Sequence, residues 1–356
     1  MEANKRIHGG DIYSNKIDLD FSVNINPFGI PDGVKKAMHE AIDSCDRYPD
    51  IFGSELRNSI AKHLSNEAFT LTPENILLGN GASELFMAVV HAIKPRRSVL
   101  MAPSFYGYEY ALSAVDCDIS YCNAEFDNMD LLKMLGADID IVFLANPNNP
   151  TGSLHKINEI IDLLKLCKAY GIYVVIDECF IDFCEEPDSV IDLIYKYDNM
   201  IVVRAFTKIF AIPGVRLGYI AAGSDVLIDS IKRQLPEWNV SVIAQQAGMA
   251  CLKETDYVKK TASYVSRQRQ FLTKGLQQLG FKVIESRANF ILFYSDVPLY
   301  GLLLDRGILI RDCSNYRGLT QGYYRIAVKT QEQNEVLLKA AGDCIEEYRT
   351  FTANGN

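Results

Sequence analysis

The sequence predicts an α/β protein, with a large domain built on a seven-stranded, mostly parallel sheet between helices and a smaller α+β domain. From about Asp32 to Arg233, seven short apolar runs alternate with longer segments of helical period. After Trp238 the alternation stops, and a long helical stretch precedes four short apolar runs and a last helix. The length of 356 residues fits two domains, and the hydrophobic content of 48% is that of a globular protein.

Each predicted element of the large domain follows from the local pattern of apolar residues. Residues 1–31 lack periodicity and are interpreted as an N-terminal arm that packs with the small domain and the functional site. The large domain is predicted over residues 32–235, where the apolar runs are short and rich in β-branched residues, as in strands covered on both faces. Seven strands are expected at residues 76–78, 99–101, 119–122, 141–145, 173–176, 201–203 and 219–222. Helices are expected between them, as over residues 85–93 and 157–167.

The small domain is predicted over residues 236–356. Apolar residues recur with a helical period over residues 257–276. Further strands are expected at residues 283–284, 290–293, 308–310 and 324–328. A final helix is expected at residues 334–348.

Composition limits the class of function. The net charge of −9, from 36 Lys and Arg against 45 Asp and Glu, argues against a nucleic-acid-binding protein, which usually carries a basic domain or stripe. Any anion site must then be built locally, from a few arginines or a helix N-terminus. The nine cysteines include no Cys-x-x-Cys pair and the five histidines lie far apart, so we expect neither a disulfide framework nor a metal site. Neither a secretory signal nor an apolar stretch of ~18 residues occurs, so a cytoplasmic protein without a membrane span is expected.

Polar clusters follow the predicted strands, where ligands bind in an alternating α/β sheet. Small residues at 79–84 precede a helix, so they either expose backbone N–H groups to a phosphate or form a plain turn. Residues 146–152 contain two Asn-Pro steps, which also fit an irregular turn. Asp177-Glu178 ends another strand, and each carboxylate there is either paired with a cation or solvated.

A lysine and an arginine complete the pattern. Thr207-Lys208 follows a predicted strand, and Arg216 lies eight residues after the lysine, which alone could point to solvent. A lysine that forms Schiff bases, an aspartate, a phosphate seat and a separate arginine are together what pyridoxal phosphate requires. On these motifs, the sequence resembles fold-type I pyridoxal-phosphate-dependent enzymes of the class I/II aminotransferase family, with matching order and spacing from His8 to Arg325.

The resemblance implies a role for each matching residue. Lys208 would form the Schiff base with the cofactor and later shuttle protons, and Asp177 would pair with the ring nitrogen. Asn149 would hydrogen-bond the 3′ oxygen of the ring, and Tyr106 would stack on its face. The cofactor phosphate would be held by groups at two strand–helix turns, namely Gly81, Ala82, Ser83, Thr207 and Arg216.

The resemblance also implies a homodimer with shared active sites, because Tyr48 is similar to a tyrosine that reaches the cofactor phosphate from the neighbouring subunit. Two positions depart from the family pattern. Phe180 stands where many of these aminotransferases have a tyrosine that donates to the 3′ oxygen, which leaves Asn149 as the main partner of that oxygen. Ala205 stands where a serine or threonine commonly reaches the cofactor phosphate. Neither change removes an essential group.

Two subfamilies compete for the reaction: histidinol-phosphate aminotransferases, and threonine-phosphate decarboxylases, which are lyases of the cobalamin side-chain pathway. Three segments resemble the decarboxylases, namely His8-Gly9-Gly10, residues 20–29 and residues 310–319. Ile25 replaces a glutamate that is usual in the aminotransferases, and Phe180 also fits the decarboxylase pattern.

The preferred reaction is decarboxylation of L-threonine O-3-phosphate, a substrate that needs one cationic group to bind its phosphate and another to bind its carboxylate. Arg311 and Arg325 would supply these two cationic groups, and His8, Asn26 and Arg6 would close the site. Transamination of histidinol phosphate with 2-oxoglutarate, and decarboxylation of phosphoserine or a phosphonate amino acid, remain open alternatives. A ligand-sensing regulator is disfavoured, because such proteins carry a DNA-binding module and no basic extension is found.

Overall fold

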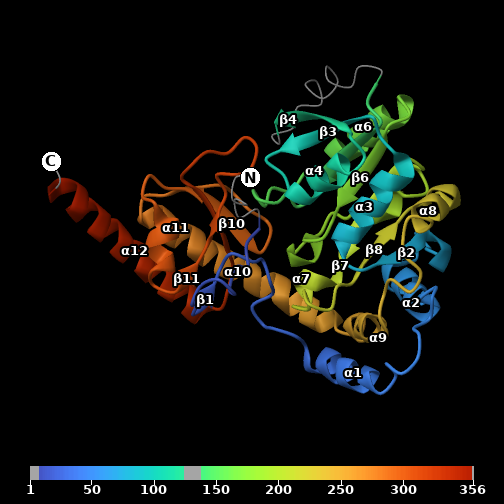
Figure 1. The fold of residues 1–356 in the computed structure, drawn as a ribbon, viewed down its shortest axis with the longest axis horizontal. Helices are drawn as coiled ribbons and strands as arrows, with labels where there is room; N and C mark the ends of the chain where they lie inside the picture. Colours follow the sequence, from blue (N-terminus) through green and yellow to red (C-terminus); the bar gives the residue numbers. More distant parts are fainter. Residues whose placement is uncertain (1–7, 124–137, 355–356) are drawn as a thin grey trace.

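The main body of this computed structural model, which describes residues 8–123 and 138–354, is a seven-stranded sheet of order β2-β8-β7-β6-β5-β3-β4. Its strands are β2 (Ile76–Gly79), β3 (Arg97–Ala102), β4 (Asp118–Asn123), β5 (Ile141–Ala145), β6 (Tyr173–Asp177), β7 (Met200–Ala205) and β8 (Gly218–Ala221). Strand β8 runs antiparallel to β2 and β7, and the other neighbours in this sheet pair in parallel (Figure 1). The predicted mostly parallel sheet is confirmed, and all seven apolar runs form strands.

The central strands divide their side chains between two apolar cores, one on each face of the sheet. In β5, Val142 and Leu144 belong to one core, whereas Ile141 and Phe143 belong to the other. The first core also contains residues of α2 (Ser54–Leu64), α6 (Ile157–Ala169) and α9 (Val242–Cys251). The second contains residues of α3 (Ala82–Ile93), α4 (Tyr106–Ser113) and α8 (Asp225–Lys232). Burial on both faces explains why these strands read as continuous apolar runs.

A second, antiparallel sheet has the strand order β12-β13-β10-β9. Its strands are β9 (Lys282–Val283), β10 (Phe290–Tyr294), β12 (Arg311–Asp312) and β13 (Tyr323–Ala327), and its helices are α10 (Thr255–Gln278), α11 (Leu299–Leu304) and α12 (Gln331–Asn354). Figure 1 shows these elements as a smaller lobe beside the large sheet. Helix α12 extends beyond both ends of the predicted helix, and its last residues contain no Gly or Pro to end it earlier.

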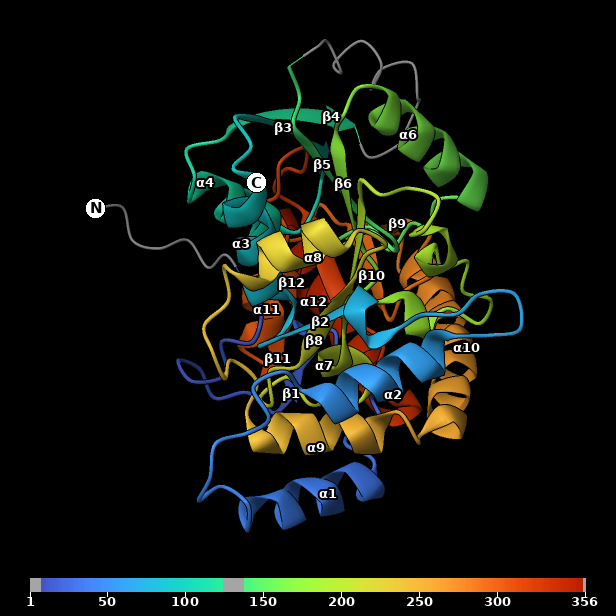
Figure 2. The same ribbon diagram turned by 90° about the vertical axis from the view of Figure 1, so that its right-hand side faces the viewer.

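The N-terminal part of the chain contacts both lobes. Strand β1 (Leu19–Asp20) pairs in parallel with β11 (Ile308–Leu309) in the smaller lobe. Helix α1 (Asp32–Ile42) packs on α9 below the large sheet, as Figures 1 and 2 both show. The boundaries 1–31, 32–235 and 236–356 stay a prediction. Among the residues that the structure describes, no helix is long and apolar enough to span a bilayer.

Candidate functional site

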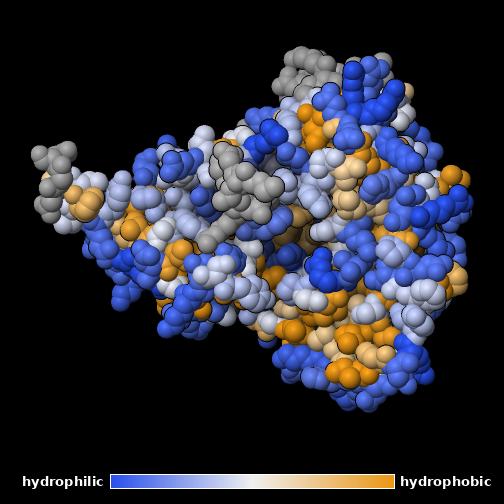
Figure 3. Space-filling view, in the orientation of Figure 1, coloured by the Kyte–Doolittle hydropathy of each residue, from blue (hydrophilic) through white to orange (hydrophobic). Residues whose placement is uncertain are grey.

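The predicted site residues meet because four strands end at the same edge of the large sheet. Strands β5, β6 and β7 run in parallel, and β2 runs in the same direction because both β2 and β7 oppose β8. The clusters that follow these strands therefore lie at one edge, where ligands bind in α/β sheets. Figure 3 shows the surface hollowed between the two lobes, next to this edge.

Lys208 lies in the short helix α7 (Phe206–Ile209), directly after strand β7. The backbone carbonyl of Lys208 accepts a hydrogen bond from the Asn26 N–H at 3.2 Å, which fixes the N-terminal arm beside it. Burial, and next the positive charge of Arg325, lower the pKa of the Lys208 amine to about 8. The neutral amine, the form that attacks carbonyl groups, is therefore roughly a fifth of the total at pH 7.4, against about 0.1% for a lysine with the usual pKa of ~10.4.

The lowered pKa predicts how Lys208 reacts with an amine reagent. In protein freed of any cofactor, the rate of labelling of Lys208 by trinitrobenzenesulfonate should rise with pH through a midpoint near 8, because only the neutral amine reacts. Exposed lysines should titrate roughly two units higher, near their usual ~10.4. Peptide mapping of protein labelled between pH 6 and 11 measures both curves, and a Lys208 midpoint equal to that of the exposed lysines would contradict the prediction.

Asp177 ends strand β6, and its carboxylate is held by two hydrogen bonds. Its Oδ2 accepts from the Tyr108 hydroxyl at 2.5 Å, and its Oδ1 accepts from the Cys179 N–H at 2.9 Å. Burial raises the pKa of Asp177, whereas the hydrogen bonds from Cys179 and Tyr108 oppose that rise. The sequence analysis did not single out Tyr108, because its position in α4 matches an ordinary buried helix residue.

Glu178, the next residue, forms a buried ion pair and hydrogen bonds within the protein core. Its side chain is fully buried and accepts from Arg204 at 2.9 Å, from the Ser189 hydroxyl and from the Val190 N–H. Asp177 is the last residue of β6, and successive residues of an extended chain point to opposite sides, so Glu178 points away from Asp177.

Replacing Glu178 with glutamine should lower the free energy of unfolding by about 3–5 kcal/mol, because Arg204 loses its fully buried carboxylate partner and keeps only the longer ion pair with Asp182 at 3.6 Å. Urea denaturation followed by circular dichroism measures this loss. The matched control, Glu109→Gln, removes the partly exposed ion pair with Arg317 and should cost at most about 1 kcal/mol. Equal losses in the two variants would contradict the structural role of Glu178.

The turn where β2 meets α3 packs against Arg216. Gly81 has a φ of 82°, and a β-carbon there would lie only 2.4 Å from Arg216 Nη2, so the guanidinium packs directly on the glycine. A β-carbon on Gly218 would lie 3.1 Å from the backbone nitrogen of Ala82. The structure thus brings Arg216 to the N-terminus of a twelve-residue helix, a combination that suits a phosphate group. Thr207 is buried beside Lys208, and Ser83 lies in the first turn of α3.

Arg311 and Arg325 are cross-strand neighbours in β12 and β13, and each is only 5% exposed. Arg311 donates to Asn315 Oδ1 at 2.8 Å, and its guanidinium lies 5.3 Å from the ring centre of Tyr316. The two neighbouring guanidinium groups concentrate positive charge in a protein whose net charge is negative.

Arg325 links the smaller lobe to the edge of the large sheet. It donates to Asn149 Oδ1 and, at 2.9 Å, to the Ser22 carbonyl. Its buried Nε has no hydrogen-bond partner among the described residues. Because Asn149 uses its oxygen here, its Nδ2 amide is the group left to donate, and its contact with the 3′ oxygen of the cofactor stays a prediction.

His8 reaches this cluster on a firmly attached segment. The Gly10 N–H donates to Ser22 Oγ at 2.7 Å, and a β-carbon on Gly9 would lie 2.4 Å from the Ser22 carbonyl oxygen. Burial, followed by the charges of Arg311 and Arg325, lowers the pKa of His8. His8 and Arg311 line a cavity of about 330 Å³. The predicted role of Arg6 falls outside the described residues.

The Asn26 side chain hydrogen-bonds to other parts of the protein. Its Nδ2 donates to the Ile209 carbonyl at 2.7 Å and to Thr261 Oγ1 at 2.9 Å, while its Oδ1 accepts from the Phe28 N–H at 3.0 Å. The side chain therefore ties the arm to α7 and α10, and its contact with a substrate stays a prediction.

Two predicted aromatic residues occupy different surroundings. Tyr106 begins α4, lines a small hollow with Arg311 and lies 6.0 Å from the His8 ring, so it is close to the arginine cluster. Tyr48 is 79% exposed and packs on Trp238. The ring-stacking role of Tyr106 and the inter-subunit role of Tyr48 stay predictions.

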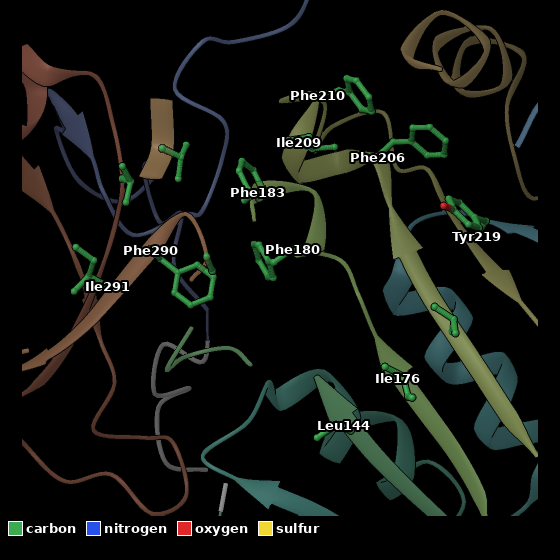
Figure 4. Close-up of a cluster of buried hydrophobic side chains, with 14 of the residues drawn as sticks. Leu144, Ile176, Phe180, Phe183, Phe206, Ile209, Phe210, Tyr219, Phe290 and Ile291 are labelled. Carbon is green, nitrogen blue, oxygen red and sulfur yellow. The ribbon is translucent and has the colours of Figure 1, made fainter. Parts of the chain in front are cut away.

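Phe180 and Ala205, the two departures from the family pattern, are both buried. Figure 4 shows Phe180 beside Phe183 and Phe290, and its ring meets that of Phe290 edge-on at 5.0 Å. Phe290 belongs to the smaller lobe, so Phe180 contributes an apolar contact between the lobes in place of a hydroxyl.

The chain is similar to known proteins in sequence and in fold. Residues 16–340 match the family "Aminotransferase class I and II". The chain is 36% identical over 331 residues to the threonine-phosphate decarboxylase of Salmonella typhimurium, covering 90% of each protein. The histidinol-phosphate aminotransferase structure from Clostridium acetobutylicum is similar with a TM-score of 0.85 and 31% identity, over 91% of this chain and 98% of that one. The L-threonine-O-3-phosphate decarboxylase structure from Porphyromonas gingivalis is similar with a TM-score of 0.83 and 26% identity, over 92% of this chain and 99% of that one.

Proposed function

Because the chain belongs to the aminotransferase class I and II family, whose members depend on pyridoxal phosphate, we propose that it is a cytoplasmic pyridoxal-phosphate-dependent carboxy-lyase. The proposed reaction removes CO₂ from L-threonine O-3-phosphate and releases 1-aminopropan-2-yl phosphate. The observation that carries this proposal is the pair of buried arginines, Arg311 and Arg325, side by side in β12 and β13. The similarity to threonine-phosphate decarboxylases supports the same reaction.

The two guanidinium groups suit a substrate with two anionic groups. An O-phospho amino acid carries a phosphate and a carboxylate, and so supplies one anion for each arginine. A substrate with a single anionic group leaves more of the repulsion between the two buried cations uncompensated. Holding both groups also fixes the rotation about the bond between Cα and the amino nitrogen, which decides whether the carboxylate or the hydrogen leaves Cα.

The residues present fit pyridoxal phosphate. Arg216, packed on Gly81 at the start of α3, would hold its phosphate together with Thr207, and Asn149 would donate to its 3′ oxygen. Asp177 would accept from its ring nitrogen. When bound, the cofactor supplies an electron-withdrawing ring that stabilises negative charge at Cα of an amino acid.

The chain's own groups supply orientation and proton transfer. Lys208, with a pKa of about 8, can hold a proton at Nζ and deliver it to Cα after CO₂ has left. His8, whose pKa is lowered by burial and then by the charge of Arg311, would stay neutral and close the substrate cavity without adding a third positive charge. Phe180 adds an apolar contact with Phe290 at the junction of the two lobes.

Incubation of the enzyme with a small substrate panel tests the reaction. The panel contains O-phosphothreonine, O-phosphoserine, a phosphonate amino acid and histidinol phosphate, each with and without 2-oxoglutarate, and mass spectrometry identifies the products. The proposal expects 1-aminopropan-2-yl phosphate from O-phosphothreonine, independent of 2-oxoglutarate. Glutamate formed only with histidinol phosphate and 2-oxoglutarate would overturn it in favour of transamination, the second candidate, which the similarity to the Clostridium acetobutylicum structure favours.

The proposal includes a homodimer with shared active sites. Tyr48 and Trp238 lie together on the surface, and Phe52 is also exposed nearby in the chain. Exposed aromatic side chains of this kind are enriched where proteins associate. A second copy of the chain would cover them and bring Tyr48 to the cofactor phosphate of its partner.

Mixed dimers of two inactive variants test the shared site. Tyr48→Phe and Lys208→Ala chains with different affinity tags should regain activity when co-expressed, because one of the two sites then contains both native residues. Tandem purification isolates the mixed dimer, and its activity is compared with that of each variant alone. A mixed dimer no more active than its parents would count against the shared site.

A further inference from the structure

Tyr108 and Asp177 form a buried pair at the centre of the site. Tyr108 is 1% exposed and comes from α4, whereas Asp177 ends β6, 69 positions later in the chain. The Tyr108 hydroxyl donates to Asp177 Oδ2 at 2.5 Å. The roles that the family resemblance implies include Asp177 and leave Tyr108 unassigned.

Packing fixes the position of this hydroxyl. The Tyr108 ring stacks on Phe143 at 5.2 Å and 24°, and it meets Phe86 edge-on at 5.0 Å and Phe105 at 5.6 Å. With three aromatic neighbours, the ring cannot swing away without opening the core. The hydroxyl is therefore a preorganised donor aimed at one carboxylate oxygen.

The charge balance of the pair favours donation by the tyrosine. Burial, and next the nearby Asp177, raise the pKa of Tyr108, so its hydroxyl keeps its proton. Asp177 is also buried, which disfavours its charged form, and the hydrogen bonds from Cys179 and Tyr108 counteract this effect. The two bonds use both carboxylate oxygens and so fix the rotation of the group.

We propose that Tyr108 is a positioning residue, which orients the Asp177 carboxylate and stabilises its charged form so that it can face a protonated ring nitrogen. The inference rests on the proposed binding of pyridoxal phosphate against Asp177. A tyrosine that only fills the core would make the same ring contacts, but removal of its hydroxyl would leave the acid–base properties of Asp177 unchanged.

Tyr108→Phe tests the proposal through the affinity of the apoenzyme for pyridoxal 5′-phosphate, measured between pH 5 and 9. One hydrogen bond to a buried charge is lost, so the affinity at neutral pH should fall about tenfold. Protonated Asp177 cannot accept from a protonated ring nitrogen, so the affinity falls as the pH decreases, and the midpoint of this fall should move to higher pH. The control, Tyr197→Phe, removes a buried hydroxyl that has no hydrogen-bond partner in the described structure, and should change neither value.

A second variant should move the acid midpoint of cofactor binding in the opposite direction. A fluorinated tyrosine placed at position 108 by amber suppression is a stronger donor, so the acid midpoint should move to lower pH. Unchanged affinity and midpoint in Tyr108→Phe, or the same shift with Tyr197→Phe, would overturn the proposal. If Tyr108→Phe does not fold, the fluorinated variant decides, and an unmoved midpoint overturns the proposal.

The carboxyl infrared band of Asp177 in the apoenzyme, identified by its loss in Asp177→Asn, separates this inference from the cofactor assignment. The pKa that this band reports should rise in Tyr108→Phe even without cofactor. A native protein that does not bind pyridoxal phosphate would refute the proposed function, and the infrared titration would still show whether Tyr108 controls Asp177. An unchanged titration would refute the role of Tyr108.

Discussion

Lys208→Ala should lower the rate of CO₂ release from O-phosphothreonine by at least roughly 10²–10⁴-fold, the usual contribution of a positioned proton donor. The loss follows from the position of Lys208 after β7, where burial and Arg325 lower the pKa of its amine to about 8. The variant loses both the proton carrier at Cα and the amine proposed to attach the cofactor. Initial rates of CO₂ release at saturating cofactor measure the change.

Covalent labelling provides the control for this prediction. Native protein treated with pyridoxal phosphate and sodium borohydride should carry the label on the peptide that contains Lys208. The matched comparison is Lys329, whose pKa burial also lowers but which lies outside the proposed site. A borohydride-stable label on Lys329, or an unchanged rate in Lys208→Ala, would show that another lysine serves the cofactor.

Arg325→Met should weaken binding of O-phosphothreonine to the holoenzyme by roughly 30-fold or more, the effect of losing one partner of a buried charge pair. Arg325 has no carboxylate among the hydrogen-bond partners that the described structure gives it, so its charge is available to the substrate. Methionine keeps much of the side-chain volume, so the loss reports the guanidinium itself. Isothermal titration in the Lys208→Ala background, whose turnover is expected to be at least roughly 10²-fold slower, measures the dissociation constant.

The control for this prediction is Arg317→Met. Arg317 lies between β12 and β13, is largely exposed and pairs with Glu109, so its removal should change binding by no more than about fivefold. Weakening by the same factor in Arg317→Met and Arg325→Met would indicate a general electrostatic effect. Unchanged binding in Arg325→Met would contradict its contact with the substrate.

The large sheet could be predicted because both of its faces are buried. Each apolar run in β5, β6 and β7 is short, continuous and flanked by polar residues. Such a run is typical of a strand that is buried on both faces of a sheet. Small shifts at the strand ends, such as Arg97–Ala102 around the predicted run 99–101, reflect hydrogen bonds that extend past the apolar residues.

Contacts between distant segments could not be predicted. The Tyr108–Asp177 bond joins α4 to β6, and no local pattern distinguishes Tyr108 from other buried tyrosines. The same holds for Asn26, whose amide contacts depend on how α7 and α10 meet. The separation of Asp177 from Glu178 follows from strand alternation, but identifying Arg204 as the partner of Glu178 needed the fold.

The residues around the cofactor seat were easier to predict than those around the substrate. Asp177 ends one strand of the large sheet, and Lys208 and Gly81 follow two others, so their meeting follows from topology. Arg311 and His8 reach the site from the smaller lobe and the N-terminal arm, whose placement depends on packing between segments far apart in the chain.

The central claim is that the bond to the carboxylate breaks, and carbon labelling tests it most directly. Purified holoenzyme is incubated with L-threonine O-3-phosphate carrying ¹³C in the carboxyl group, without any oxo acid, and labelled CO₂ and 1-aminopropan-2-yl phosphate are both quantified. The account predicts equimolar release of the two products over many turnovers. Absence of labelled CO₂, together with amino-group transfer when 2-oxoglutarate is added, would contradict it.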